Sequence, residues 1–165
     1  MAKITALIHV HDEEIPGLGR ALDSLRPCDQ ILVVNHDRDK KVERIASRHG
    51  AEALTGILGV SPGAYLVNAK YDWLLALRPS EMLSERLQNS LELWKHEGEH
   101  EDASAFSVSI SEESGAGWRA CTPETRLVNR KKVNWTGEIP PSHLKAPQLK
   151  GDLLRFRLKQ AKKAA

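Results

Sequence analysis

The sequence lacks several features that would assign a chain of 165 residues to a class at once. It has only two cysteines, Cys28 and Cys121, and no Cys-x-x-Cys pair, which argues against a secreted disulfide framework and against zinc or redox chemistry at cysteine. No apolar run reaches membrane-spanning length. The first run, at residues 4–10, also lacks the length and cleavage-site pattern of a signal peptide. We therefore expect a cytoplasmic protein without a transmembrane segment.

Large net charge and common phosphate-binding motifs are missing as well. The formal net charge is +2, which is too small to indicate a nucleic acid or a membrane as partner. No Gly-x-Gly-x-x-Gly opens a helix, and there is no Walker sequence; neither "PGLG" nor "GVSPG" has the required spacing. These absences argue against a dinucleotide-binding Rossmann domain and a P-loop protein.

What is present indicates a folded domain, because 41% of the residues are hydrophobic and 28% are charged. We predict one domain at residues 1–149 and a basic C-terminal tail, with a weak helical pattern, at residues 150–165. Strand-like and helix-like patterns alternate in the first part. The predicted strands are residues 4–10, 30–34, 51–54 and 73–77, and the predicted helices are residues 18–25, 40–50 and 79–97. This alternation predicts an α/β protein with a mainly parallel sheet.

After the acidic residues 98–102, the pattern changes to short β-like pieces joined by glycine and polar residues. These pieces are residues 103–110, 117–122, 125–129 and 132–137. Their spacing predicts antiparallel, hairpin-linked strands. The whole sheet is therefore expected to be mixed.

Four segments resemble, in their order, the bacterial, short family-2 glycosyltransferases. The segments are "HDEEIPGLGRALDSL", "DQILVVNHDRDKKVERIASRHGA", "YDWLLALRPSEML" and "TRLVNRKKVNWTGEI", and the resemblance spans residues 4–139. It implies a three-layer α/β/α, Rossmann-like nucleotide-diphospho-sugar transferase (glycosyltransferase-A) fold with a mixed sheet. It further implies a nucleotide-diphospho-sugar donor, a glycan or lipid acceptor, and the Mn²⁺ or Mg²⁺ cofactor of the family.

The family's metal-binding Asp-x-Asp is replaced in this sequence. Matched by position, its first aspartate is Arg78, the next residue is Pro79, its second aspartate is Ser80, and the following acid is kept as Glu81. In the family these aspartates hold a divalent cation that offsets the charge of the leaving diphosphate. An arginine cannot bind a cation, so the resemblance predicts that the usual metal ligands are absent and that the protein has lost or changed its activity.

Three interpretations of Arg78 are open. Its guanidinium contacts the diphosphate directly, with Glu81 beside it, and so replaces the metal. Alternatively the site has decayed. In the third interpretation Arg78 faces solvent beside a helix start, with Pro79 at the first helical position and Glu81 favoured by the helix dipole. We predict Arg78 and Glu81 as the diphosphate-binding residues.

The loops after the first two strands carry the predicted nucleotide-binding residues, which occupy the positions where the family binds the base and ribose. These residues are His11, Asp12, Glu13, Asn35, Asp37 and Asp39. Asn35 stands where the family has an aspartate, so it keeps a hydrogen-bonding group but loses the charge. In the alternative interpretation, Asp37 and Asp39 only stabilise the N-terminus of the next helix.

Histidines at the same strand ends raise the question of a metal. Neighbouring parallel strands end at one edge of a sheet, so His36 with Asp37 can approach His11 there. We interpret His9 as a hydrogen-bonded core histidine rather than a ligand, and we predict no metal site.

A catalytic base is the last requirement, because inverting transferases deprotonate the acceptor hydroxyl. The family's late His-Glu pair falls at Pro140 and Pro141, and neither transfers a proton. The flanking Glu138 and His143 are the predicted catalytic residues, and a plain proline-bordered loop is the alternative.

Three functions remain open. The first is a metal-independent glycosyltransferase with Arg78 at the diphosphate. The second is a non-catalytic module of the same fold that binds a nucleotide, a glycan or a protein; the loss of the family's chemical groups favours it. The third is a nucleotidyltransferase or another Rossmann-like binder. The donor sugar, the acceptor, turnover itself and the oligomeric state are not determined by the sequence.

Overall fold

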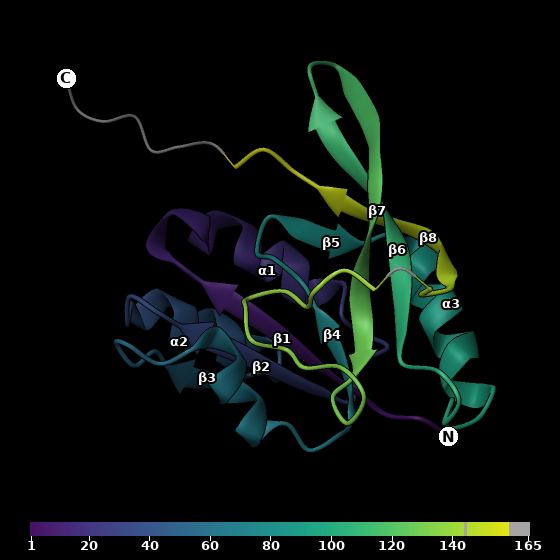
Figure 1. The fold of residues 1–165 in the computed structure, drawn as a ribbon. Coiled ribbons are helices and arrows are strands. Elements are labelled where there is room, and N and C mark those ends of the chain that lie inside the picture. Colours follow the sequence, from purple (N-terminus) through teal and green to yellow (C-terminus); the bar gives the residue numbers. More distant parts are fainter. Residues whose placement is uncertain (144, 159–165) are drawn as a thin grey trace.

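The computed structural model describes residues 1–143 and 145–158, which form an α/β fold around one mixed sheet (Figure 1). Within these residues the sheet has eight strands in the order β3-β2-β1-β4-β7-β6-β8-β5. Its parallel half consists of β1 (Ile4–Val10), β2 (Gln30–Asn35), β3 (Glu52–Thr55) and β4 (Trp73–Ala76). Every residue of β1 is buried, because β1 lies between β2 and β4 and both of its faces are covered.

The other half of the sheet is mostly antiparallel. It consists of β5 (Glu81–Leu83), β6 (Ala105–Ser114), β7 (Gly117–Asn129) and β8 (Gln148–Arg155). β7 runs antiparallel to both β4 and β6, while β8 runs parallel to β6 and antiparallel to β5. The β6–β7 hairpin projects beyond the rest of the molecule in Figure 1. The predicted mixed sheet is thus confirmed.

Both faces of the sheet are covered. One face packs against the apolar sides of the three α helices, which are α1 (Ile15–Asp23), α2 (Lys40–Arg48) and α3 (Glu85–His96). The opposite face packs against the 3₁₀ helix η2 (Pro62–Asn68) and against the segment that contains Val133 and Trp135. A second 3₁₀ helix, η1 (Asp12–Glu14), joins β1 to α1.

The predicted helix at residues 79–97 is wrong at its start. Residues 81–83 form β5, which pairs with β8, and α3 begins only at Glu85. The Oγ atom of Ser84 accepts a hydrogen bond from the amide of Leu87 and so caps α3. Pro79 is therefore not at the first position of a helix, and Glu81 does not face a helix N-terminus.

Further predictions in the last third of the chain are also corrected. The helical pattern expected from residue 150 is wrong up to Arg155, since these residues belong to β8, and Leu153 is fully buried in the core. The boundary placed between residues 149 and 150 therefore falls inside a strand of the sheet. Residues 132–137, expected to be β-like, form a loop. Residues 159–165 of the predicted tail lie outside the described residues.

Across the described ranges, none of the helices combines the length and the apolar character that crossing a bilayer requires.

Candidate functional site

The carboxyl ends of β1 and β2 bring two histidines into contact. His9 is the penultimate residue of β1, and His36 directly follows β2. The amide of His36 donates to the carbonyl of Val10 at 3.1 Å, which holds the two strand ends together. As a result, Nδ1 of His9 lies 2.7 Å from Nε2 of His36. The expected meeting of the two loops at one sheet edge is therefore observed, with His9 as a buried, hydrogen-bonded histidine.

His11 and Glu138 complete this group. The ring of His11 stacks on that of His36, with ring centroids 4.5 Å apart. Its Nε2 lies 3.0 Å from Oε1 of Glu138, and that same oxygen is 4.0 Å from Nδ1 of His9 and 4.0 Å from Nε2 of His36. We refer to His9, His11, His36 and Glu138 as the histidine cluster. Three imidazoles thus surround one carboxylate, which comes from more than 100 residues later in the chain.

The loop that carries Glu138 is anchored on η2. The buried indole of Trp135 packs under the sheet, and its Nε1 donates to the carbonyl of Gly137 at 2.6 Å. The amide of Gly63 donates to the carbonyl of Thr136 at 3.0 Å. A Cβ atom at Gly63 would collide with the backbone of Trp135, so glycine is required for this close approach. This contact fixes the position of Glu138.

Burial and nearby charges shift the pKa values of the three histidines in different directions. Burial lowers the pKa of His9 to about 4, although Glu138 opposes this effect. Burial also lowers the pKa of His36, and the nearby charge of His11 acts in the same direction. For His11, burial acts downward, but the hydrogen bond and charge of Glu138 outweigh it and raise the pKa. Near neutral pH, His9 and His36 are therefore neutral, and His11 is the histidine that most readily carries a proton.

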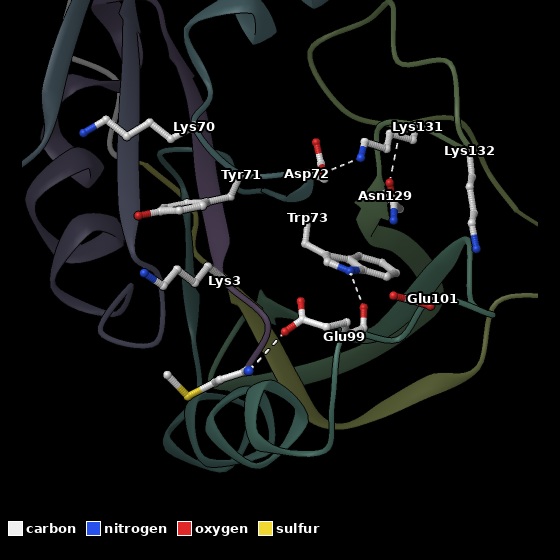
Figure 2. A pocket seen from close by; sticks show the side chains of 11 residues that line it. Lys3, Lys70, Tyr71, Asp72, Trp73, Glu99, Glu101, Asn129, Lys131 and Lys132 are labelled. Carbon is white, nitrogen blue, oxygen red and sulfur yellow. Dashed lines mark hydrogen bonds and ion pairs between the residues drawn. The ribbon is translucent and has the colours of Figure 1, made fainter.

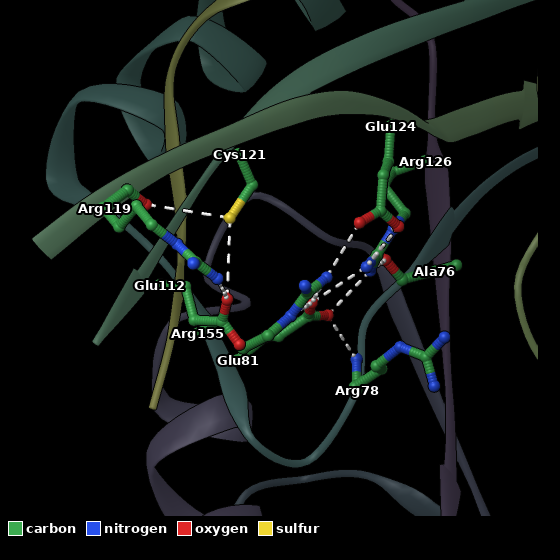
Figure 3. A network of polar contacts seen from close by, with 9 residues as sticks. All are labelled: Ala76, Arg78, Glu81, Glu112, Arg119, Cys121, Glu124, Arg126 and Arg155. Atoms are coloured by element: carbon green, nitrogen blue, oxygen red, sulfur yellow. Dashed lines mark hydrogen bonds and ion pairs between the residues drawn. The ribbon is translucent and has the colours of Figure 1, made fainter. Parts of the chain in front are cut away.

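Arg78 follows β4 and lines a cavity of about 220 Å³ beside the cluster. The cavity is lined by His9, Glu13, Glu14, Leu77, Arg78, Glu138 and Ile139. Within residues 1–143 and 145–158, no hydrogen bond or ion pair is found for the guanidinium of Arg78. Figure 3 shows it pointing away from the carboxylate of Glu81. The backbone of Pro79 packs so closely on Gly17 of α1 that a Cβ there would collide with it. The turn is held in place while the arginine side chain stays open to a ligand.

Glu81 has a different environment, although it is only three residues from Arg78. Its carboxylate is fully buried and receives both terminal nitrogens of Arg126, at 2.7 and 2.8 Å (Figure 3). Arg155 donates to it at 3.0 Å and to Glu124 at 2.8 Å. We call Glu81, Glu124, Arg126 and Arg155 the ion network. It joins β5, β7 and β8 to each other.

The ion network keeps Glu81 ionised. Burial alone would raise the pKa of Glu81, but the hydrogen bonds and charge of Arg126 hold it below its ordinary value of 4.5. Its Oε1 also accepts the backbone amide of Arg78 at 2.9 Å. Glu81 is therefore placed to support the turn from the inside, through the backbone of Arg78.

The other predicted nucleotide-binding residues mostly organise the two loops. Asn35 is buried and donates through Nδ2 to the carbonyl of Asp39. Asp39 caps α2 by accepting from the amide of Lys41 at 2.8 Å, as the helix-stabilising interpretation expected. Asp37 accepts the amide of Asp12 at 2.7 Å and so ties the first loop to the second.

Three predicted site residues from separate parts of the chain share the cavity, namely Glu13, Arg78 and Glu138. His143 is exposed, and its amide donates to Oγ1 of Thr125; it is not among the residues that line the cavity. Sequence reasoning missed Glu14, which lines the cavity and accepts the amide of His11 at 3.2 Å. The run of acids in "HDEE" was the available signal for it.

A second cavity, of about 520 Å³, lies where β1 and β4 begin, at the opposite edge of the sheet (Figure 2). Several of its charges are already matched. Lys131 pairs with Asp72 at 3.1 Å, and the N-terminal amine pairs with Glu99 at 3.0 Å. Lys3 lies over the ring of Tyr71. We therefore place the candidate site at the carboxyl edge, where ligands bind in open α/β sheets.

No protein-family model matches this sequence, and no curated protein matches it. Solved structures do share the fold. A mycobacterial protein superposes with a TM-score of 0.60 at 11% identity, over 99% of this chain and 69% of the other. 4-Diphosphocytidyl-2C-methyl-D-erythritol synthase superposes with a TM-score of 0.54 at 15% identity, over 99% of this chain and 94% of the other.

A third structure is glucosyl-3-phosphoglycerate synthase from Mycobacterium tuberculosis in complex with phosphoglyceric acid. Its TM-score is 0.50 at 13% identity, and the match covers 70% of this chain and 45% of the synthase. The chain thus has an α/β, Rossmann-like nucleotide-diphospho-sugar transferase fold, the glycosyltransferase-A fold, as the sequence predicted. Membership in family 2 stays a prediction.

Proposed function

We propose that this protein binds a nucleotide-diphospho-sugar at the carboxyl edge of its sheet and is a glycosyltransferase-like protein in which Arg78 replaces the metal-binding acids. One observation carries the proposal. The guanidinium of Arg78 has no partner within the described residues, and it lines a cavity at the edge where this class of sheet binds ligands. A guanidinium can donate two parallel hydrogen bonds to a phosphate, and this supplies the positive charge that a metal would otherwise provide.

The environment of Glu81, the acid kept from the family motif, supports a phosphate-binding role for Arg78. Glu81 is fully buried, and two arginines and the amide of Arg78 use its oxygens. It therefore does not compete with an anion for the side chain of Arg78. The names of two structural neighbours, a glucosyl synthase and a diphosphocytidyl synthase, are consistent with a ligand of this kind.

Glu138 is the proposed base in a catalytic form of the protein. Its carboxylate borders the cavity and is half-exposed, so it can accept a proton from an acceptor hydroxyl. His11 holds the carboxylate in position at 3.0 Å. His143, the other predicted catalytic residue, remains a prediction with an exposed position on the same loop.

A second candidate is a non-catalytic binding module of the same fold. The observation that favours it is the size of the cavity, about 220 Å³, against roughly 300–1,000 Å³ for typical small-molecule sites. Such a cavity accepts part of a nucleotide-sugar rather than a donor and an acceptor together. This candidate predicts binding without turnover.

The test is a thermal-shift panel of UDP-, GDP- and TDP-sugars, with CTP added for the nucleotidyltransferase alternative, each with and without Mn²⁺. A metal-independent rise in melting temperature that is lost in Arg78→Ala supports the proposal. Arg44→Ala, an exposed arginine on α2, is the matched control and should keep the shift. Absence of a shift with every nucleotide would contradict the proposal. Release of nucleotide over time, lost in Glu138→Gln, then separates the enzyme from the binding module.

A further inference from the structure

The histidine cluster has the composition of a metal centre. In it, Nδ1 of His9, Nε2 of His36 and a carboxylate oxygen of Glu138 all lie within 4.8 Å of one another. Neutral imidazole nitrogens and carboxylate oxygens are ligands of Zn²⁺ and related first-row ions, and two histidines with one glutamate form a known catalytic zinc set. No cysteine or Asp-x-Asp motif takes part.

The distances between the ligand atoms suit one ion. Two metal–ligand bonds of about 2.0–2.2 Å at a tetrahedral angle place their ligand atoms roughly 3.3–3.6 Å apart. The observed separations are 2.7 Å between His9 and His36, and 4.0 Å from each of them to Glu138. Small side-chain rotations therefore suffice to bring all three atoms to the required spacing.

Neighbouring residues orient the three proposed ligands, as outer-shell residues do in metal sites. His11 donates to Glu138 at 3.0 Å and orients its carboxylate. The ring of Tyr65 packs edge-on against both His9 and His36, with centroids 5.9 and 6.0 Å away. Two ligands lie at the ends of packed strands, and the third lies on the loop fixed by Gly63. Such support is what a preorganised metal site requires.

In place of the sequence-based prediction of no metal site, we propose that His9, His36 and Glu138 bind one first-row transition metal ion of the Zn²⁺ type, with His11 as the residue that positions Glu138. Three protein ligands leave a coordination position for water or another oxygen ligand, as in catalytic zinc sites. Both His9 and Glu138 border the cavity that Arg78 lines, so this position is next to the proposed anion site. The metal site does not depend on the nucleotide-sugar binding proposed at Arg78. When the ion is bound, Glu138 is a ligand, so the role of base proposed for Glu138 belongs to the metal-free protein.

The competing account is that the imidazoles only hydrogen-bond to one another. The buried Nε2 of His9 has no partner in the described part of the chain in either account, because the proposed ligand atom is Nδ1, so it does not distinguish the two. The hydrogen-bond account offers no reason for a third imidazole and a distant carboxylate to converge on the same pair.

The test is a titration of chelator-treated, dialysed protein with Co²⁺, followed by displacement with Zn²⁺ and by metal analysis of the purified protein. We expect one equivalent of Co²⁺ to bind with the intense visible absorption of a tetrahedral or five-coordinate ion. His36→Ala and Glu138→Gln should weaken binding most. His11→Ala should weaken it by roughly 10–100-fold, as loss of an outer-shell partner does. His96→Ala, an exposed histidine on α3, is the control and should leave binding unchanged.

Thermal unfolding in chelator checks that each variant is folded. If His36→Ala does not fold, Glu138→Gln decides the question, because the side chain of Glu138 is 39% exposed and its replacement keeps the size of the residue. Absence of stoichiometric Co²⁺ binding, or binding that Glu138→Gln leaves equal to that of His96→Ala, would overturn the proposal. Because no nucleotide is present in the assay, its outcome does not depend on the nucleotide-sugar proposal.

Discussion

The molecule has two polar clusters that differ in how completely their hydrogen-bonding groups are paired. In the ion network two carboxylates meet two guanidiniums, and Glu81 alone accepts from Arg126, from Arg155 and from the amide of Arg78. In the histidine cluster three imidazoles share the single carboxylate of Glu138. A cluster whose charges are all paired serves the stability of the fold, whereas unpaired donors at a sheet edge are what a ligand site requires.

The two clusters meet at the turn after β4. The residue at its first position, Arg78, has its side chain in the cavity, and the residue at its end, Glu81, has its side chain in the core. Because Glu81 holds the amide of Arg78, the ion network positions the arginine that lines the cavity beside the histidine cluster. Substitutions in the ion network and next to the loop that carries Glu138 separate the two roles.

The largest expected effect is on stability, from Glu81→Ala. This change leaves the buried guanidinium of Arg126 without its main partner, and such a loss costs about 3–5 kcal/mol. Urea denaturation of the wild type and the variant measures it. Glu112→Ala removes an ion pair of the same type with Arg119 at the surface, and it should change stability little. Equal losses in the two variants would show that the ion network has no special role.

The same network predicts a pH dependence. The folded state holds the pKa of Glu81 below its ordinary value of 4.5, so the folded protein binds fewer protons than the unfolded chain in this range. The contribution of ionised Glu81 to the free energy of unfolding is complete above the ordinary pKa of 4.5. It is lost as the pH falls through the lower pKa of the folded state. The pKa of Glu124 is also lowered, although burial acts against this, and Glu124 adds to the effect.

Unfolding free energies measured from about pH 6 down to about pH 3 test this prediction. We expect the wild type to lose stability with acid more steeply than Glu81→Gln, in which Glu124 still contributes. A Glu81→Gln protein with the same acid slope as the wild type would contradict the assignment.

Gly63→Ala should lower stability less than Glu81→Ala does, and it should also weaken metal binding at the histidine cluster. The added Cβ forces the backbone of Trp135 away, and overpacking of this kind costs about 1–3 kcal/mol. Since this backbone carries Glu138, Co²⁺ binding should weaken as well. Gly117→Ala, where a Cβ meets open space, is the control. If Gly63→Ala binds Co²⁺ as the wild type does, the loop does not position Glu138.

Much of the parallel half of the sheet could be predicted from local patterns. Continuous apolar runs identified β1 and β2, and a helical spacing ending at Gly50 identified α2. The predicted order of elements also placed His11 and His36 at one edge of the sheet, while His9 was predicted as a core histidine. These features depend on residues that are close in sequence.

The failures have a common cause in contacts between distant segments. Met82 and Leu83 fit a helical stripe, but pairing with β8 makes them a strand; Ser84 before Glu85 was the local signal for the true helix start. In β8, Gly151 has a φ of 101°, and the register against β6 shifts beside it, which hides the alternation of a strand. Likewise, no local pattern joins Glu81 to Arg126.

The most direct test of the central claim is a calorimetric titration of the protein and of Arg78→Ala with the nucleotide-sugar found in the panel, in the presence of a chelator. We predict that the wild type binds without metal and that Arg78→Ala binds at least roughly tenfold more weakly, as the loss of a charged hydrogen bond implies. Binding that requires added Mn²⁺, or that Arg78→Ala leaves unchanged, would contradict the account.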